Sequence, residues 1–271
     1  MARDGSGERG AEDRPDRYRA PALDKGLDIL ELLAQVDTGL SQAEIAKTLH
    51  RTPNEIYRML DTLVRRGYVR RNPEDRYDLT LKLFDLSHRH RPVNRLIAQA
   101  MPVLRRIARE AGQACHLVLA DRDALVVVAQ VDGPDYWNVS VRMGARVGLI
   151  DTGSGHVILA WSPPAERQAL VAAHGLDPEA ALTPAFTAHL DAVRARGHED
   201  IPSRQVACVR NLSVPVLGPT GAALAALTCP FTERLDRTGG PDAAHTLVLL
   251  AAGAGELSQR SAAGAAPQEE D

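Results

Sequence analysis

The chain has 271 residues and a formal net charge of −3, and hydrophobic residues make up 44% of it while aromatic residues make up 4%. This length suffices for one large domain or two smaller ones, and the slight negative charge excludes a generally basic surface, so any attraction to nucleic acid requires a local patch. No apolar run approaches the roughly 20 residues of a membrane span, and residues 1–20 lack the apolar segment of a secretory signal, so we predict a cytoplasmic protein without membrane contacts.

Both ends of the chain differ in composition from the rest. Residues 1–20 mix Gly, Asp, Glu and Arg without periodicity, and residues 263–271 form a short polar end, so both are expected to be disordered tails. The three cysteines, Cys115, Cys208 and Cys229, are an odd number and lie in apolar stretches. We therefore expect buried, reduced thiols rather than disulfides.

Residues 21–82 follow a helical pattern that ends in a hairpin. A first amphipathic helix is predicted from apolar residues at three-to-four spacing, namely Leu23, Leu27, Leu30 and Ala34. The stretch 68–79, "YVRRNPEDRYDL", predicts two short strands around a turn, because Asn, Pro and Asp interrupt it in the middle.

Two capping boxes mark further helix starts between these features. Ser41 is followed by Glu44, and Thr52 is followed by Pro53 and Glu55. This pattern satisfies the free amides of a first helical turn, so helices are expected to begin at Ser41 and at Thr52. Two helices joined by a tight turn and followed by a hairpin predict a winged helix-turn-helix.

The charge of this region is typical of a DNA-binding surface. Between His50 and Arg76 there are seven arginines against four acidic residues, a local net charge of +3. A recognition helix reads base edges in the major groove, where Arg58 is suited to guanine and Asn54 to adenine, while hairpin arginines reach phosphates or the minor groove. The residues predicted to contact DNA are Ser41, Gln42, Arg51, Thr52, Asn54, Glu55, Tyr57, Arg58, Arg70, Arg71 and Arg76.

From about Pro92 the chain mixes helices with strands at hairpin spacing. A helix is predicted first, with the inward residues Leu96, Ala100, Leu104 and Ile107. Strands are then expected at 115–120, 124–131, 137–144, 204–209, 211–218 and 221–231. Further helices are expected at 154–161, at 187–197 and from about Pro241 onward. This order predicts an α+β fold with an antiparallel sheet.

Several of these segments carry a family resemblance. "LDILELLA", "GLSQAEIAKTLHRTPNEIYRMLDTLVRRGYVRR", "VGLIDTGSGHVILAW" and "RNLSVPVLGPTGAALAALTCPF" make the chain similar to IclR-type bacterial transcriptional regulators over nearly its whole length. The resemblance implies a winged helix-turn-helix over 21–82, a linker helix over 83–96 and a GAF-like effector-binding and oligomerisation domain over 97–262. It also implies homodimers, often paired into tetramers, that bind double-stranded operator DNA and a small organic acid or related metabolite, without a cofactor.

The stretch 149–155, "LIDTGSG", also matches half of an aspartic-protease site. Such a site needs two carboxylates that share a proton, and the chain has a single Asp-Thr-Gly. Asp151 is therefore expected to cap the following helix or to line a pocket. Thr152, Gly153 and Ser154 are expected to form the turn before that helix, where backbone amides favour an anion.

The resemblance also implies where the effector lies. By its motifs, the effector contacts are Val139, Val147, Gly153, Ser154, Val209, Asn211 and Thr228. Arg142 could bind a carboxylate or form a structural ion pair, and an expected acidic pocket residue falls at Asp200 or Ile201. The chain departs from the family pattern in having Asn211 for a cysteine, Pro230 for a serine, and Gly-His-Glu for Gly-Tyr-Ala at 197–199.

The leading hypothesis is a non-enzymatic DNA-binding regulator whose operator affinity changes when a metabolite binds the C-terminal domain. One alternative is a DNA-binding dimer whose C-terminal domain only dimerises. Another is an enzyme that uses Asp151, Ser154 and His156, but side chains two apart on a helix point away from each other. His116 and His156 match no zinc spacing, so no metal site is predicted.

Overall fold

The computed structural model describes residues 20–89, 91–234 and 240–263, and the chain divides into two compact units, residues 1–90 and 91–271. The tails expected to be disordered lie, except for one residue of each, outside these described ranges. No helix within the ranges is both long enough and apolar enough to cross a bilayer. Each unit has its own hydrophobic core.

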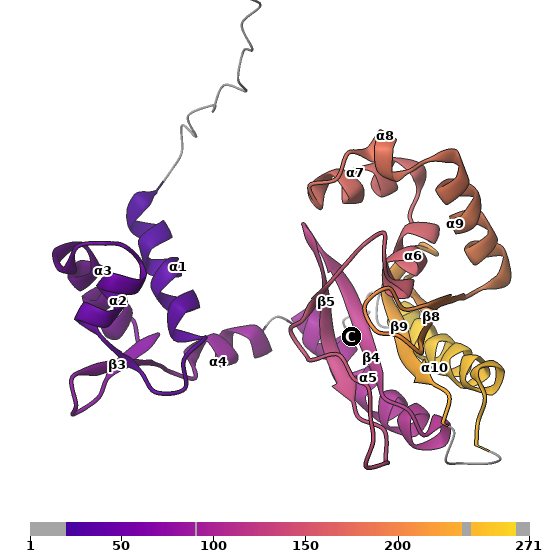
Figure 1. The fold of residues 1–271 in the computed structure, drawn as a ribbon, viewed down its shortest axis with the longest axis horizontal. Helices are drawn as coiled ribbons and strands as arrows, with labels where there is room; N and C mark the ends of the chain where they lie inside the picture. The colour runs from indigo at the N-terminus through magenta and orange to yellow at the C-terminus, as the bar shows by residue number, and fades with distance from the viewer. Residues whose placement is uncertain (1–19, 90, 235–239, 264–271) are drawn as a thin grey trace, which may run out of the picture. The chain divides into compact units, whose positions relative to one another are not determined.

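The first unit is a winged helix-turn-helix with a small antiparallel sheet (Figure 1). Its elements are α1 Pro21–Leu33, β1 Leu40–Ser41, α2 Gln42–Thr48, α3 Pro53–Arg65, β2 Val69–Arg71, β3 Arg76–Leu79 and α4 Lys82–His88. β3 lies between β1 and β2, and β2 with β3 forms the predicted hairpin. Both predicted capping boxes are confirmed, with Ser41 and Thr52 as the capping residues of α2 and α3.

The helix α1 buries a different face from the one predicted. Leu23 and Leu27 are 61% and 46% exposed, whereas Ile29 and Leu33 are buried against α2 and α3. Two apolar stripes on α1 both satisfy helical spacing, so periodicity alone could not choose between them. The choice depends on which face α3 and β3 contact.

The second unit is a six-stranded antiparallel sheet covered by helices on both faces (Figure 1). Its strands are β4 Cys115–Asp121, β5 Ala124–Val131, β6 Arg146–Val147, β7 Glu199–Pro202, β8 Val209–Leu217 and β9 Ala223–Thr232, in the order β6-β5-β4-β9-β8-β7. Its helices are α5 Arg91–Ala111, α6 Gly153–Ala160, α7 Pro164–Ala173, α8 Pro178–Ala181, α9 Pro184–Arg196 and α10 Ala243–Ala263. The α+β class predicted from the sequence is confirmed.

Each face of this sheet has its own core. The predicted inward residues of α5 are buried with Leu117, Leu227 and Leu250, in the core that α5 and α10 form over one face. Val118, Leu125 and residues of α6 and α9 form the core on the other face. Because side chains alternate along a strand, neighbouring residues of one strand belong to opposite cores.

Two predicted strands are wrong. Residues 137–144 form a loop, and only Arg146–Val147 pairs with β5. This loop turns at Gly144, which has a φ of +82° and donates its amide to the Val127 carbonyl. Residues 204–208 also form no strand, because they lie in the connection from β7 to β8. The prediction missed β7, α7 and α8 altogether.

Two further expectations need correction. The linker helix over 83–96 falls on two helices, because α4 ends at His88 and α5 begins at Arg91. Pro92 stands in the first turn of α5, where a proline fits because its missing amide has no acceptor to lose. Cys115 and Cys229 are buried free thiols as predicted, but Cys208 is exposed in the turn before β8.

Candidate DNA interface and effector site

The helix α3 has the geometry of a recognition helix. Thr52 caps its first turn. The Gln42 side chain at the start of α2 donates to the Pro53 carbonyl at 2.9 Å, and this hydrogen bond fixes the turn between the two helices. Asn54, Tyr57 and Arg58 lie exposed on α3, on the side opposite Ile56 and Leu60. These three side chains have the amide, phenol and guanidinium groups that can read base edges.

Glu55 is held within the protein rather than presented outward. Its carboxylate accepts hydrogen bonds from Lys25 at 2.6 Å and from the Thr52 amide at 3.0 Å. The hydrogen bond from Lys25, then that from Thr52, lower the pKa of Glu55 to about 2. Of the predicted DNA contacts, Glu55 and the capping hydroxyls of Ser41 and Thr52 are therefore placed to hold helix starts in position.

The wing arginines differ in how they are paired. Arg76 donates to the Gly39 carbonyl at 2.8 Å and pairs with Glu44 at 3.0 Å, so it braces the wing against α2. Arg70 pairs with Asp78 at 3.6 Å, and Arg71 forms a hydrogen-bonded pair with Asp75. Both arginine side chains are exposed, so their guanidinium groups remain accessible to a phosphate.

Arg51 is a further exposed arginine that is predicted to contact DNA. It stands just before α3 and pairs with Asp28 at 3.9 Å. Arg58, by contrast, enters no ion pair with any residue in the described part of the chain. Arg58 is thus an exposed cation of α3 with no acidic partner among the described residues.

In the second unit, glycines let α6 approach the sheet closely. A side chain at Gly155 would meet the Leu149 carbonyl oxygen at 2.0 Å, and one at Gly153 would meet the Ser213 hydroxyl at 2.7 Å. Thr152 caps the helix, because its hydroxyl accepts from the Gly155 amide at 3.1 Å and donates to the Gly148 carbonyl at 2.6 Å. Gly153 and Ser154 are the first two helical residues, whose amides have no acceptor within the helix.

Asp151 does not cap α6, which was one of the two roles expected for it. Thr152 provides the cap, and the half-buried Asp151 carboxylate accepts from the Gln205 amide at 3.3 Å. It also packs over Gly148, where an added Cβ would meet the Asp151 carboxylate at 1.6 Å. Asp151 therefore ties the loop before α6 to the loop between β7 and β8.

Beneath the first turn of α6 lies a buried cluster of hydroxyl groups. Thr228 on β9 lies 2.9 Å from the Ser154 hydroxyl and 2.8 Å from the Ser213 hydroxyl. Asn211 lies beside Gly153, since a Cβ on that glycine would be 3.1 Å from the Asn211 Cβ. Four residues predicted to contact the effector, Gly153, Ser154, Asn211 and Thr228, are thus brought together from three elements.

His116 extends this polar surface and was missed as part of it. It pairs in register with Thr228, and its neighbours Cys115 and Leu117 point into the opposite core, so His116 faces α6. Its Nδ1 is buried without a hydrogen-bond partner among the described residues. Burial lowers the pKa of His116 to about 4, so the ring is neutral near pH 7.

The other predicted pocket residues are more scattered. Val209 is buried on the same face of β8 as Asn211. Val147 in β6 packs against the core under α6, whereas Val139 and the exposed Arg142 lie in the loop that the prediction took for a strand. Because these two residues are not in a strand, strand geometry does not place them beside the hydroxyl cluster.

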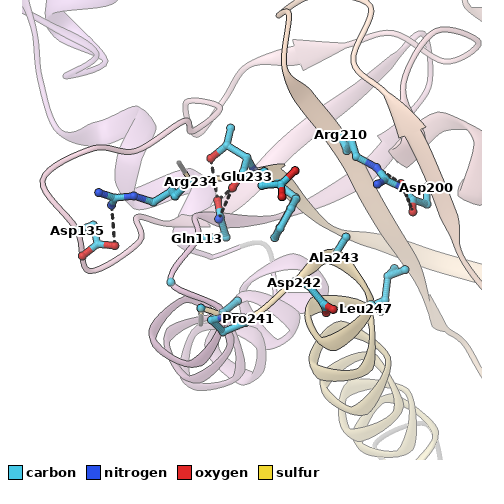
Figure 2. Close-up of a pocket in the computed structure, with 16 residues that line it drawn as sticks. Gln113, Asp135, Asp200, Arg210, Glu233, Arg234, Pro241, Asp242, Ala243 and Leu247 are labelled. Carbon is cyan, nitrogen blue, oxygen red and sulfur yellow. Dashed lines mark hydrogen bonds and ion pairs between the residues drawn. The ribbon is translucent and has the colours of Figure 1, made fainter. Parts of the chain in front are cut away.

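Asp200 belongs to the other face of the sheet. Its carboxylate accepts two hydrogen bonds from Arg210, at 2.9 and 2.5 Å (Figure 2). Its register partner Leu212 packs under α5 and α10. A pocket of about 570 Å³ lies here, between the end of β9 and the start of α10. Gln113 and Asp242 line this pocket together with Asp200. Because the register partner of Asp200 faces α5 and α10, the sheet separates Asp200 from the hydroxyl cluster.

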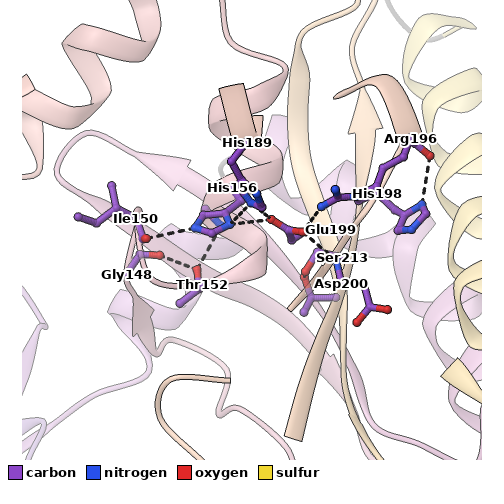
Figure 3. A network of polar contacts seen from close by, with 12 residues as sticks. Gly148, Ile150, Thr152, His156, His189, Arg196, His198, Glu199, Asp200 and Ser213 are labelled. Atoms are coloured by element: carbon purple, nitrogen blue, oxygen red, sulfur yellow. Dashed lines mark hydrogen bonds and ion pairs between the residues drawn. The ribbon is translucent and has the colours of Figure 1, made fainter. Parts of the chain in front are cut away.

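A second cluster of polar side chains, around the buried Glu199, was not predicted. Glu199 on β7 is fully buried, and its Oε2 lies 2.7 Å from His156 Nδ1 and 2.6 Å from His189 Nε2 (Figure 3). Burial raises the pKa of Glu199, but hydrogen bonds from His156, His189 and the Asp200 amide outweigh it and lower the pKa to about 2. The three residues are 43 positions apart at most and follow no motif spacing, so only the packing of α6, α9 and β7 reveals them.

His156 and Ser154 therefore have separate partners. The Ser154 hydroxyl contacts Thr228, whereas His156 contacts Glu199 and the Ile150 carbonyl. A nucleophile and its base must share a hydrogen bond, and these two do not. The enzyme alternative is therefore not supported, because Ser154 and His156 do not form a catalytic pair.

A winged helix-turn-helix and a separate sheet domain with a polar surface under α6 define a class of protein, the DNA-binding transcriptional regulators with a C-terminal effector domain. Comparison with known families makes this specific. The IclR helix-turn-helix domain matches residues 22–73, and the family described as "Bacterial transcriptional regulator IclR C-terminal" matches residues 92–256. The chain belongs to the IclR family.

Named relatives agree with this assignment, and solved structures share the fold. The regulator KdgR of Escherichia coli is 28% identical over 76% of this chain and 80% of its own, and the glycerol operon regulatory protein of Streptomyces griseus is 29% identical over 81% and 88%. An IclR regulator from Alicyclobacillus acidocaldarius has a TM-score of 0.68 at 23% identity, covering 90% and 100% of the two chains. An IclR homologue from Microbacterium hydrocarbonoxydans, solved with 4-hydroxybenzoate, has a TM-score of 0.72 at 19% identity, covering 89% and 99%. The relatives are regulators of transcription, so the chain is not an enzyme.

Proposed function

We propose that this regulator binds operator DNA through the exposed side of α3 and through the wing. The observation that carries the proposal is the doubly capped helix-turn-helix, which leaves Asn54, Tyr57 and Arg58 facing outward. Phosphate contacts by Arg51, Arg70 and Arg71 would set the register without reading sequence. Since bacterial DNA lies in the cytoplasm, the protein is expected to act there.

The DNA interface is tested by capturing chromosomal fragments with the purified chain and measuring operator affinity by fluorescence anisotropy. Arg58→Ala is expected to weaken specific binding by about 1–3 kcal/mol while binding to unrelated DNA changes little. Arg105→Ala, an exposed arginine of α5 in the other unit, is the matched control and is expected to bind like the parent. Equal affinity of the Arg58 variant and the parent would remove Arg58 from the interface.

We further propose that a small organic acid binds on the polar surface under α6 and changes operator affinity. The first amides of α6 favour an anion, and Ser154, Asn211, Thr228 and His116 supply hydroxyl, amide and imidazole groups around them. The 4-hydroxybenzoate bound by the Microbacterium homologue is a carboxylate of this class. Coupling between two such sites typically amounts to about 1–3 kcal/mol, or roughly 5–150-fold in affinity.

The effector proposal is tested with a panel of small carboxylic acids, 4-hydroxybenzoate included, by thermal shift and then by operator binding. An acid that raises the unfolding temperature should change operator affinity, and Asn211→Leu should abolish both responses. If no acid of the panel shifts either quantity, the organic-acid proposal fails and the alternative of a unit that only dimerises is favoured.

The chain is also expected to work as a homodimer, with tetramers as a further possible assembly. The segment at α4 carries three leucines that are 39–80% exposed, namely Leu81, Leu83 and Leu86. A second copy would bury them and place two recognition helices on the halves of a near-palindromic operator. Light scattering of the parent and of Leu81→Glu would test this, with a shift to monomer as the expected result.

A further inference from the structure

Three potential metal ligands meet in the second unit at one point. His156 Nδ1 from α6, His189 Nε2 from α9 and Glu199 Oε2 from β7 lie 2.6 to 3.2 Å apart (Figure 3). His156 and Glu199 are buried, and the His189 side chain is 34% exposed. Phe186 packs its edge against the His156 ring at 5.1 Å and stacks on the His189 ring at 6.2 Å, so both imidazoles are held in place.

A backbone hydrogen bond orients His156 Nδ1 toward the other two ligands. The Ile150 carbonyl, 3.1 Å from His156 Nε2, can only accept, so Nε2 donates to it. Nδ1, on the other side of the ring, is thereby aimed at Glu199 Oε2 at 2.7 Å and at His189 Nε2 at 3.2 Å. A backbone carbonyl that orients the imidazole in this way is a common second partner of metal-bound histidine.

Glu199 is arranged to offer one oxygen. Its Oε1 accepts from the Arg196 guanidinium and from the Asp200 amide, so Oε2 alone points at the two histidines. Zinc ligands lie about 2.0–2.2 Å from the ion, so atoms separated by 2.6 to 3.2 Å can reach one ion together. Two imidazoles and one carboxylate are a ligand set that zinc uses when it keeps a position open.

We propose that His156, His189 and Glu199 form a binding site for a divalent transition-metal ion, zinc by preference. The partly exposed His189 leaves the fourth position toward solvent, where a water or an oxygen of a small ligand completes the coordination. The ion links α6, α9 and β7. It lies close to the hydroxyl cluster, because Ser154 precedes His156 by two residues and Ser213 pairs in register with Glu199.

The site is tested by titrating Zn²⁺ into the full chain, prepared without a histidine tag and freed of metal, in a calorimeter. One high-affinity ion per chain is expected. His189→Ala should weaken that binding by at least about 10–100-fold, the loss typical for removing even a supporting partner of a metal ligand. His245→Ala, an exposed histidine on α10, is the matched control and should bind zinc like the parent.

Two further measurements separate this site from binding to surface histidines. Co²⁺ in the parent should give the intense visible absorption of a four-coordinate ion, and His189→Cys should retain tight zinc binding because a thiolate replaces the imidazole. Circular dichroism of the metal-free variants checks that each is folded. Zinc binding of equal strength in the parent and in His189→Ala, or a six-coordinate Co²⁺ spectrum, would overturn the proposal.

Discussion

The hydroxyl of Thr228 lies between those of Ser154 and Ser213, at 2.9 and 2.8 Å, in a buried contact that joins α6 to the last two strands of the sheet. Thr228→Val keeps the shape of the side chain but leaves two buried hydroxyls short of a partner. We expect a loss of about 1–3 kcal/mol in the free energy of unfolding, measured by urea denaturation. The double variant Thr228→Val with Ser154→Ala should lose less free energy of unfolding than the two single variants together. Strict additivity of the two losses would argue against the contact.

The wing pair of Arg71 and Asp75 predicts opposite effects of two substitutions on DNA binding. Arg71→Ala removes a phosphate contact, so affinity should fall for all sequences and the slope of log affinity against log salt should become less steep by about 1. Asp75→Asn removes the carboxylate that competes with phosphate for Arg71, so affinity should rise at low salt. Titrations at several salt concentrations measure both. Identical slopes for all three proteins would place the wing away from DNA.

His116 predicts a loss of stability in acid. Burial lowers its pKa from the ordinary 6.5 to about 4 in the folded protein, so the unfolded chain binds a proton first as the pH falls. The stabilisation is complete above pH 6.5 and is lost between pH 6.5 and about 4, at up to about 1.4 kcal/mol per pH unit.

The measurement for His116 compares the parent with His116→Gln, which has no titrating group, by urea denaturation across this range. The parent should lose stability faster than the variant as the pH falls, and their difference isolates His116 from other titrating residues. His198→Gln, just before β7, is the control and should follow the parent. Parallel curves for the parent and His116→Gln would mean that the ring is not kept neutral by burial.

Two helical glycines predict opposite results for the same substitution. Gly155→Ala would place a methyl group 2.0 Å from the Leu149 carbonyl oxygen, so α6 must move off the loop before it. We expect a clear drop in the unfolding temperature and loss of any ligand response. Gly255→Ala on α10 meets nothing within 4 Å and should stabilise the protein by about 1 kcal/mol. A Gly155→Ala protein as stable as the parent would contradict the close approach of α6.

Local signals in the sequence were sufficient for the helix-turn-helix and the hairpin of the first unit, though not for the buried face of α1. The capping boxes at Ser41 and Thr52 and the hairpin at 68–79 depend on residues within a few positions of each other, and all three are observed. The strands 115–121 and 124–131 and the helix at α6 follow from equally local patterns. The family resemblance located Gly153, Ser154, Asn211 and Thr228, which the fold brings together.

Other features could not be predicted because they depend on contacts between distant segments. The alternating pattern at 137–144 is typical of a strand. The strand that pairs with β5 is nevertheless Arg146–Val147, which lies after this segment. Asp200 lies on the opposite face because the register of β7 against β8 decides it, and a shift of one residue would exchange the faces.

The amino-acid order by itself thus determined the class of the protein, the starts of α2 and α3 and the cationic character of α3 and the wing, since each depends on neighbours along the chain. Only the tertiary structure decided which side chains share a site. His156, His189 and Glu199 converge, and His116 joins Thr228, because packing α6 and α9 against the sheet brings together residues that have no fixed spacing in the chain.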